Sequence, residues 1–179
     1  DIYIQKNLHT LVEALALLAK RVPNIHLKIA GRIVDVVYFD EINTRLVAHG
    51  LHNRVEFLGS IQPQKLLELY RNCQMLVFPS TVETFGNPLV EAMACGTPIV
   101  SSRFAAMPEI LGDAGLFFDP LDPKDIAAKI FDLMNDSQLR AELGQRGLSR
   151  VREFSLPVTA KKTSLILRTA VIGPRGRPI

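Results

Sequence analysis

Two glutamates, Glu83 and Glu91, stand on either side of a predicted helix start in the segment VETFGNPLVEAMACGTPIV, residues 82–100. A carboxylate repels phosphate but has about four acceptor sites, so it can hold a pair of neighbouring hydroxyl groups. Glu83 precedes the helix and Glu91 lies on its first or second turn. We therefore expect the two carboxylates to point to different places and to bind hydroxyls at two ends of one ligand.

The residues between the glutamates suit a diphosphate. Gly86 tolerates positive φ and lets a ligand approach the backbone. Asn87 is predicted as the N-cap and Pro88 as the first helical residue. Backbone N–H groups at a helix start bind phosphate. Since proline has no N–H, we expect the donors at Asn87, Leu89 and Val90.

Hydroxyl clamps on either side of a diphosphate cradle describe a nucleotide sugar, with ribose at one glutamate and a hexose at the other. Two alternatives stand beside this interpretation. The first is a binding module that holds a nucleotide or sugar without turnover. The second is a glycosidase acid/base pair, which needs two carboxyls about 5–10 Å apart across one bond. A phosphate cradle between the glutamates argues against the second alternative.

The elements around this segment alternate between helix and strand. Apolar residues at helical spacing predict helices over 7–22 (with Asn7 as N-cap), 36–49, 62–73, 87–95, 107–111, 123–135, 137–153 and 156–170. Short apolar runs predict strands over 25–31, 54–59, 74–79, 97–102 and 114–119. This order is typical of a Rossmann-like α/β fold with an open, doubly wound parallel sheet. In such sheets ligands bind beyond the carboxyl ends of the strands, where the segment 82–100 begins.

Composition bounds the class of protein. The chain has 179 residues, 47 % hydrophobic and 22 % charged, as expected of one globular domain. We assign residues 1–170 to it and expect 171–179 to be a disordered tail. A net charge of +3 without a basic stripe does not indicate a nucleic-acid partner. Cys73 and Cys95 form no ligand pattern and are expected to be buried free thiols of a cytoplasmic protein. No apolar run approaches the roughly 20 residues of a membrane span.

The segment PSTVETFGNPLVEAMACGTPIVSS, residues 79–102, resembles the signature of the group 1 glycosyltransferases (family 4), which are retaining enzymes of the GT-B fold. The matching residues are Pro79, Ser80, Glu83, Phe85, Gly86, Glu91, Ala92, Met93, Ala94, Gly96, Pro98 and Val100. KNLHTLVEALALL, VEFLGSI and MPEILGDAGLFFDPLDPKDIAAKI are similar to further stretches of the family, so the resemblance covers about residues 5–155.

The resemblance implies a role for each matched residue. Glu83 would contact hydroxyls of the transferred sugar, and Glu91 would hold the ribose. Lys6 matches the lysine that binds the diphosphate, which makes Lys6 and Glu83 the expected catalytic residues. The donor-binding residues would be Phe85, Gly86, Asn87, Pro88, Leu89 and Glu91.

The implied reaction cleaves a UDP- or GDP-sugar and transfers the hexose to an acceptor with retention of configuration. Lys6, the amides of 87–90 and the helix dipole would stabilise the leaving diphosphate without an obligatory metal or other cofactor. The chain resembles the C-terminal, donor-binding half of such an enzyme, so we expect it to be inactive without an N-terminal acceptor domain. We expect the full-length enzyme to be a peripheral membrane protein.

Two departures from the family pattern affect these expectations. The first strand of the family's donor domain, which usually ends in a Gly-Arg pair, has no counterpart in DIYIQKN, so the chain reads as a piece of a longer protein. Ala105 and Ala106 stand where many members have two glycines. If those glycines use positive φ, the loop of this chain is expected to differ.

Overall fold

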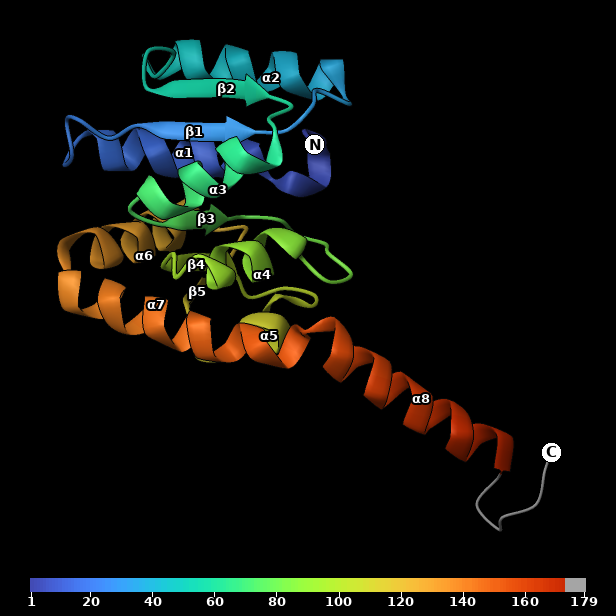
Figure 1. Cartoon of the computed structure of the whole chain (residues 1–179). Coiled ribbons are helices and arrows are strands. Elements are labelled where there is room, and N and C mark those ends of the chain that lie inside the picture. The colour runs from blue at the N-terminus through green and yellow to red at the C-terminus, as the bar shows by residue number, and fades with distance from the viewer. Residues whose placement is uncertain (173–179) are drawn as a thin grey trace.

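Strands and helices alternate along the computed structural model of the chain, which describes residues 1–172 (Figure 1). The strands are β1 Leu27–Ala30, β2 Val55–Gly59, β3 Leu76–Phe78, β4 Ile99–Ser102 and β5 Leu116–Phe118. The helices are α1 Leu8–Ala19, α2 Val36–Ala48, α3 Pro63–Asn72, α4 Asn87–Ala94, α5 Met107–Leu111, α6 Pro123–Asn135, α7 Ser137–Arg150 and α8 Leu156–Ile172. Short 3₁₀ turns, η1 Ile4–Lys6 and η2 Val151–Phe154, precede α1 and α8. Each predicted element is present, within a few residues of its expected ends. Most of the tail expected at 171–179 lies outside the described residues.

All strands are parallel, but they form two ladders. β1 pairs with β2, and β3, β4 and β5 pair in that order. In Figure 1 the arrows of β2, β1 and β3 lie one below the other and point the same way, and β4 and β5, which are parallel to β3, are labelled below it. A Rossmann sheet has the strand order 3-2-1-4-5-6. The break between β1 and β3 therefore falls where that order places its first strand.

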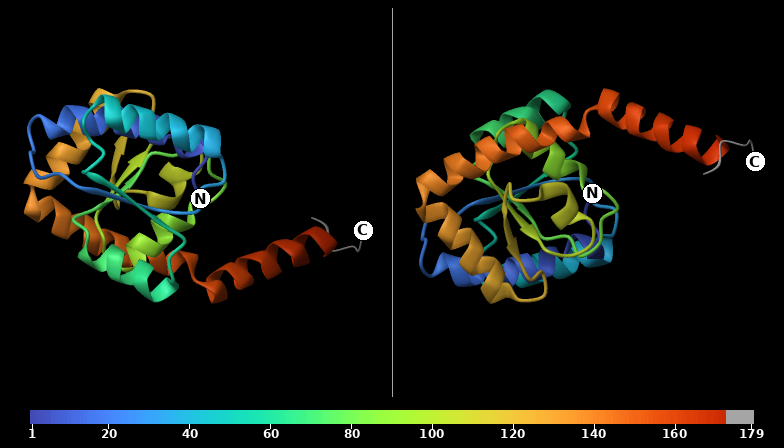
Figure 2. Two further views of the ribbon diagram at one scale, coloured as in Figure 1. Left: turned by 90° about the horizontal axis from the view of Figure 1, so that it is seen from above. Right: turned by 90° about the horizontal axis from the view of Figure 1, so that it is seen from below.

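Helices cover both faces of the strands, as expected for a doubly wound fold (Figure 2). On one face, α1 packs against α2 and α6 over a core that includes Leu15, Ile42 and Ile126. On the other face, α4 contacts α5 and α7, and a second core includes Tyr70 and Met93. The first core contains residues from both sides of the break between β1 and β3, so side-chain packing joins the two ladders.

Asn7 precedes α1 as predicted, but its side chain does not cap the helix. Asn7 has φ 55°, and its buried amide donates to the carbonyl oxygens of Pro79 at 3.1 Å and Pro120 at 2.7 Å. Its Oδ1 accepts a hydrogen bond from Thr10 at 2.7 Å. The side chain is thus recruited to tie the start of α1 to the loops that follow β3 and β5.

Ala105 also has positive φ, at 51°, so the loop after β4 keeps a left-handed residue without glycine. The expectation that this loop differs from that of relatives with two glycines stays a prediction. A left-handed alanine costs roughly 1 kcal/mol. The two cysteines are free, but Cys73 is exposed and Cys95 half-buried, so the expectation that both are buried is wrong.

The last helix, α8, extends away from the rest of the molecule (Figure 1). Leu165, Ile166 and Leu167 on it are each at least 60 % exposed. Within residues 1–172, no helix combines the length and the apolar character that a membrane crossing requires.

Candidate functional site

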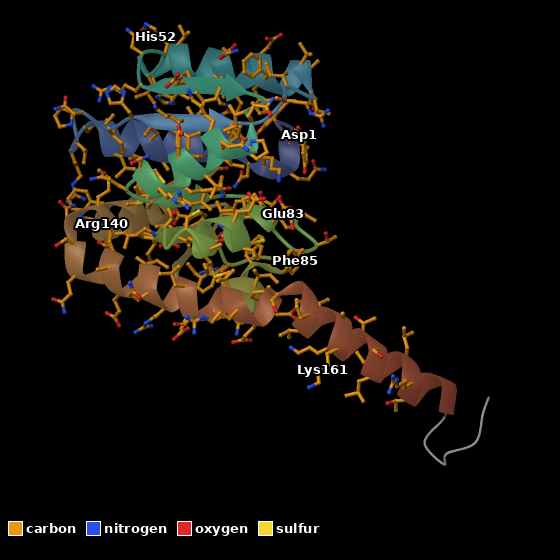
Figure 3. All side chains as sticks on the ribbon, viewed as in Figure 1. Asp1, His52, Glu83, Phe85, Arg140 and Lys161 are labelled. Carbon is orange, nitrogen blue, oxygen red and sulfur yellow. The ribbon has the colours of Figure 1, made fainter. Side chains whose placement is uncertain are left out.

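Lys6 and Glu83 meet where η1 reaches the loop between β3 and α4. The Lys6 Nζ lies 2.5 Å from the Glu83 Oε1, and the two side chains are only 21 % and 16 % exposed. The Thr81 amide donates to the carbonyl oxygen of Gln5 at 2.9 Å, which fixes the two segments side by side. Figure 3 shows Glu83 at the edge toward which the strands point. The structure thus brings together the two residues predicted to be catalytic.

Two aromatic rings flank the Lys6 ammonium. Its Nζ lies 5.3 Å from the centroid of the Tyr3 ring and 5.6 Å from that of Phe78. Cation–π attraction and the Glu83 carboxylate hold the ammonium at this edge of the sheet. An ammonium has three N–H donors, so the ion pair leaves donors for an anionic ligand.

The helix start differs by one residue from the prediction. Gly86, not Asn87, is the N-cap of α4, with φ 83°, and Pro88 is at the second helical position. A Cβ on Gly86 would lie 3.3 Å from the Leu89 Cδ1, and the positive φ disfavours any larger residue. The Leu89 amide donates to the Gly86 carbonyl oxygen at 2.9 Å. Leu89 is therefore not a free donor, which leaves Asn87 and Val90 as the candidate phosphate amides.

Glu91 faces a different element from Glu83. Its Oε2 accepts a hydrogen bond from the Tyr70 hydroxyl of α3 at 3.0 Å. The Glu91 residue is exposed, whereas Tyr70 is 8 % exposed. Burial, and next the negative charge of Glu91, raise the pKa of Tyr70 well above its ordinary value. The two carboxylates therefore belong to separate environments on either side of the α4 start, and not to one facing pair.

Phe85 packs against η2 instead of lying over Lys6 and Glu83. Its ring meets the Phe154 ring edge-to-face, with centroids 5.7 Å apart. It is still 38 % exposed, so one side remains open to a ligand. Figure 3 shows Phe85 and Glu83 at the same end of the molecule.

Two surface hollows of the described residues lie away from these side chains. One, of about 270 Å³, is lined by residues of α5, η2, α8 and the end of α7, including Glu109 and Arg150. The other, of about 280 Å³, lies between α1 and the end of α2. Neither includes Lys6, Glu83 or Glu91.

His49, which stands near His52 in the sequence, belongs to an ion-pair network. Its Nε2 lies 2.8 Å from the Glu13 carboxylate, which also pairs with Arg45. Within the described residues, no group of three or more His, Cys, Asp or Glu side chains is placed to hold a metal ion.

Sequence reasoning missed Tyr70, Tyr3 and the role of Asn7. Tyr70 lies on the apolar face of an amphipathic helix, where a tyrosine reads as core. The feature that could have indicated a role beyond the core is its hydroxyl, because a buried tyrosine O–H needs a hydrogen-bond partner. No local pattern pairs that hydroxyl with Glu91, because the partners are 21 residues apart.

Comparison with known proteins identifies the class. The family described as Glycosyl transferases group 1 matches residues 2–150, and the chain belongs to this family. O-antigen chain mannosyltransferase B of Escherichia coli is 38 % identical over 117 residues, which are 65 % of this chain and 31 % of that protein.

Solved structures show the same fold. The crystal structure of Anabaena HepE in complex with UDP and glucose has a TM-score of 0.84 and 25 % identity, over 94 % of this chain and 46 % of that one. The C-terminal domain of a group 1 glycosyl transferase, LpcC of Francisella tularensis, has a TM-score of 0.76 and 27 % identity. That match covers 87 % of this chain and 83 % of that one. Apart from LpcC, whose structure is a single domain, these proteins are two to three times as long as the match.

Proposed function

We propose that this chain binds a UDP- or GDP-sugar as the C-terminal donor half of a retaining family 4 glycosyltransferase. The observation that carries the proposal is the meeting of Lys6 with Glu83 beside the start of α4, with Glu91 on the same helix. A cation and a helix N-terminus suit a diphosphate, and the carboxylates suit hydroxyls on either side of it. HepE, whose structure contains UDP and glucose, supports a nucleotide-sugar donor.

The roles of the residues follow from their chemistry. Lys6 and the amides of Asn87 and Val90 bind the diphosphate and stabilise the charge that develops on it when the sugar bond breaks. Glu91 binds the ribose, and Glu83 binds hydroxyls of the hexose while it keeps Lys6 in place. These fixed positive groups perform the task that a metal performs in other transferases, so the proposed reaction needs no metal.

The acceptor and any catalytic base belong to an N-terminal domain in this proposal. The match to the C-terminal domain of LpcC supports it, since that match covers 83 % of the LpcC domain. Two free cysteines suit the reducing cytoplasm. Peripheral membrane association of the full-length enzyme is a further part of the proposal, for which lipid flotation of that enzyme is the test.

Calorimetric titration of the full chain with UDP and GDP tests the proposal. We expect one of the two to bind, and Glu91→Ala to weaken it about tenfold by removing the ribose acceptor. Glu142→Ala, on the exposed surface of α7, is the matched control and leaves binding unchanged. A folded chain that binds neither nucleotide would contradict the proposal.

The second candidate is a module that binds a nucleotide sugar without transferring it. The chemistry of the site suggests it, because Lys6, Glu83 and Glu91 suit the binding of a donor whether or not its sugar is then transferred. Transfer of sugar to an acceptor by the full-length protein would exclude this candidate, and donor binding without transfer would favour it. A glycosidase pair is disfavoured, because Glu83 engages Lys6 whereas Glu91 engages Tyr70.

A further inference from the structure

Tyr70 connects the core beneath α4 to the carboxylate on its surface. The ring lies in the core that contains Leu89 and Met93, both fully buried on α4. The hydroxyl emerges from this core and donates to the Glu91 Oε2 at 3.0 Å. An exposed helix residue is thereby attached to a rigid part of the fold.

The backbone of Tyr70 is fixed as well. Its carbonyl oxygen accepts a buried hydrogen bond from the Thr97 hydroxyl at 2.7 Å and a weaker one from the Cys73 thiol at 3.4 Å. Thr97 lies in the turn after α4, so α3 and the far end of α4 are joined at this point. A tyrosine with a fixed backbone and a packed ring has only its hydroxyl rotor left to adjust.

We propose that Tyr70 is a positioning residue that holds the Glu91 carboxylate in the orientation that receives the ribose hydroxyls. The inference rests on the proposed function. A carboxylate has about four acceptor sites, and the Tyr70 hydroxyl occupies one of them. The remaining sites, including both on Oε1, are left for two neighbouring hydroxyls.

Positioning matters here because Glu91 is exposed. A free glutamate side chain samples many rotamers, and a ligand that selects one must overcome the lost entropy. The Tyr70 hydrogen bond removes part of that freedom before the ligand arrives. The raised pKa of the Tyr70 hydroxyl keeps it protonated, so it remains a donor over the working pH range.

A double-mutant cycle tests this role. Tyr70→Phe removes only the hydroxyl, and we expect it to weaken binding of UDP or GDP, whichever the wild-type chain binds, about fivefold. In the Glu91→Ala background, the same substitution should change nothing, because the carboxylate that it positions is gone. The 2′,3′-dideoxy form of the nucleotide, which lacks both ribose hydroxyls, should bind equally to wild type and Tyr70→Phe.

Tyr38→Phe is the matched control. Tyr38 on α2 is 3 % exposed, and its hydroxyl is hydrogen-bonded to His9 at 2.9 Å, away from the candidate site. This variant loses a buried hydroxyl and should keep wild-type affinity. Circular dichroism before each titration shows that the variants are folded.

Two results would overturn the inference alone. One is a Tyr70→Phe chain that binds the nucleotide as wild type does. The other is an equal loss for the ribo- and dideoxy-nucleotides, which would assign Tyr70 a general structural role. If the folded wild-type chain binds neither UDP nor GDP, the proposed function fails and this inference fails with it.

Discussion

At the scale of single residues, the Lys6–Glu83 ion pair is the central feature of the candidate site. The pair is mostly buried, and an ion pair in such a place loses hydration that the attraction must offset. The Tyr3 and Phe78 rings supply part of that offset. The result is an ammonium held in one place with N–H donors still available, as a diphosphate requires.

Lys6→Met should separate binding of the diphosphate from binding of the nucleoside. Methionine keeps an apolar stem against the two rings but lacks the charge. We expect about tenfold weaker binding of UDP and no change for uridine, because uridine has no phosphate for Lys6 to contact. If the wild-type chain binds GDP instead, GDP and guanosine replace UDP and uridine in this test and its control. Calorimetric titration of both ligands measures the difference.

Lys20→Met, at the other end of α1, serves as the control and should bind UDP as wild type does. Equal losses for UDP and uridine in Lys6→Met would mean that the substitution disturbs the fold of the site. Unchanged UDP binding would remove Lys6 from the diphosphate site.

The residue types of the candidate site could be read from the sequence, but their partners could not. Glu83 and Glu91 are conspicuous by spacing, and their separate environments follow from their places before and on a helix. Tyr70 could not be assigned to Glu91, nor Lys6 to Glu83, because each pair is joined only when distant segments fold together. Lys6 and Glu83 are 77 positions apart in the sequence.

At the scale of elements, the type, order and approximate bounds of the helices and strands were predictable, whereas the N-cap of α4 and the side-chain partners of the N-cap of α1 were not. Asn87 has the stronger N-cap propensity, yet Gly86 takes the cap because its φ of 83° sets the entry of the chain. Asn7 is the reverse case. It stands at the cap, but its side chain satisfies two distant carbonyl groups instead. At Asn7 a long-range demand prevailed over a local preference.

Asn7→Ala should destabilise the protein by about 2–4 kcal/mol, because it leaves the Pro79 and Pro120 carbonyl oxygens and the Thr10 hydroxyl with fewer partners in a buried place. Asn7→Gly separates this loss from backbone strain, since glycine accepts φ 55° without a Cβ penalty. We expect glycine to recover only the strain, roughly 1 kcal/mol. Urea unfolding followed by circular dichroism measures both variants.

Full recovery of stability in Asn7→Gly would show that the left-handed backbone, and not the side-chain hydrogen bonds, explains the need for asparagine. Thr10→Val provides a matched control, because it removes one of the three contacts and should cost about 1 kcal/mol.

At the scale of the whole molecule, the break between β1 and β3 separates the backbone ladders but not the core. Helix α1, which comes before β1 in the sequence, packs on α6, which comes after β5. Leu15 and Ile126 belong to one cluster of buried residues. Strand order was not predictable from local patterns, since each strand alone has the same apolar character. Side-chain packing, and not a continuous sheet, must therefore transmit stability across the break.

One cooperative unfolding transition follows from this shared core. Leu15 is 3 % exposed on α1 and Ile126 is fully buried on α6. Leu15→Ala and Ile126→Ala should each lower the free energy of unfolding by about 2–4 kcal/mol, through lost burial and the cavity that remains. Both should shift the same single transition, in urea, whether circular dichroism or tyrosine absorbance follows it. A biphasic curve, with Leu15→Ala shifting one phase and Ile126→Ala the other, would show that the two ladders unfold independently and that the core does not bridge the break.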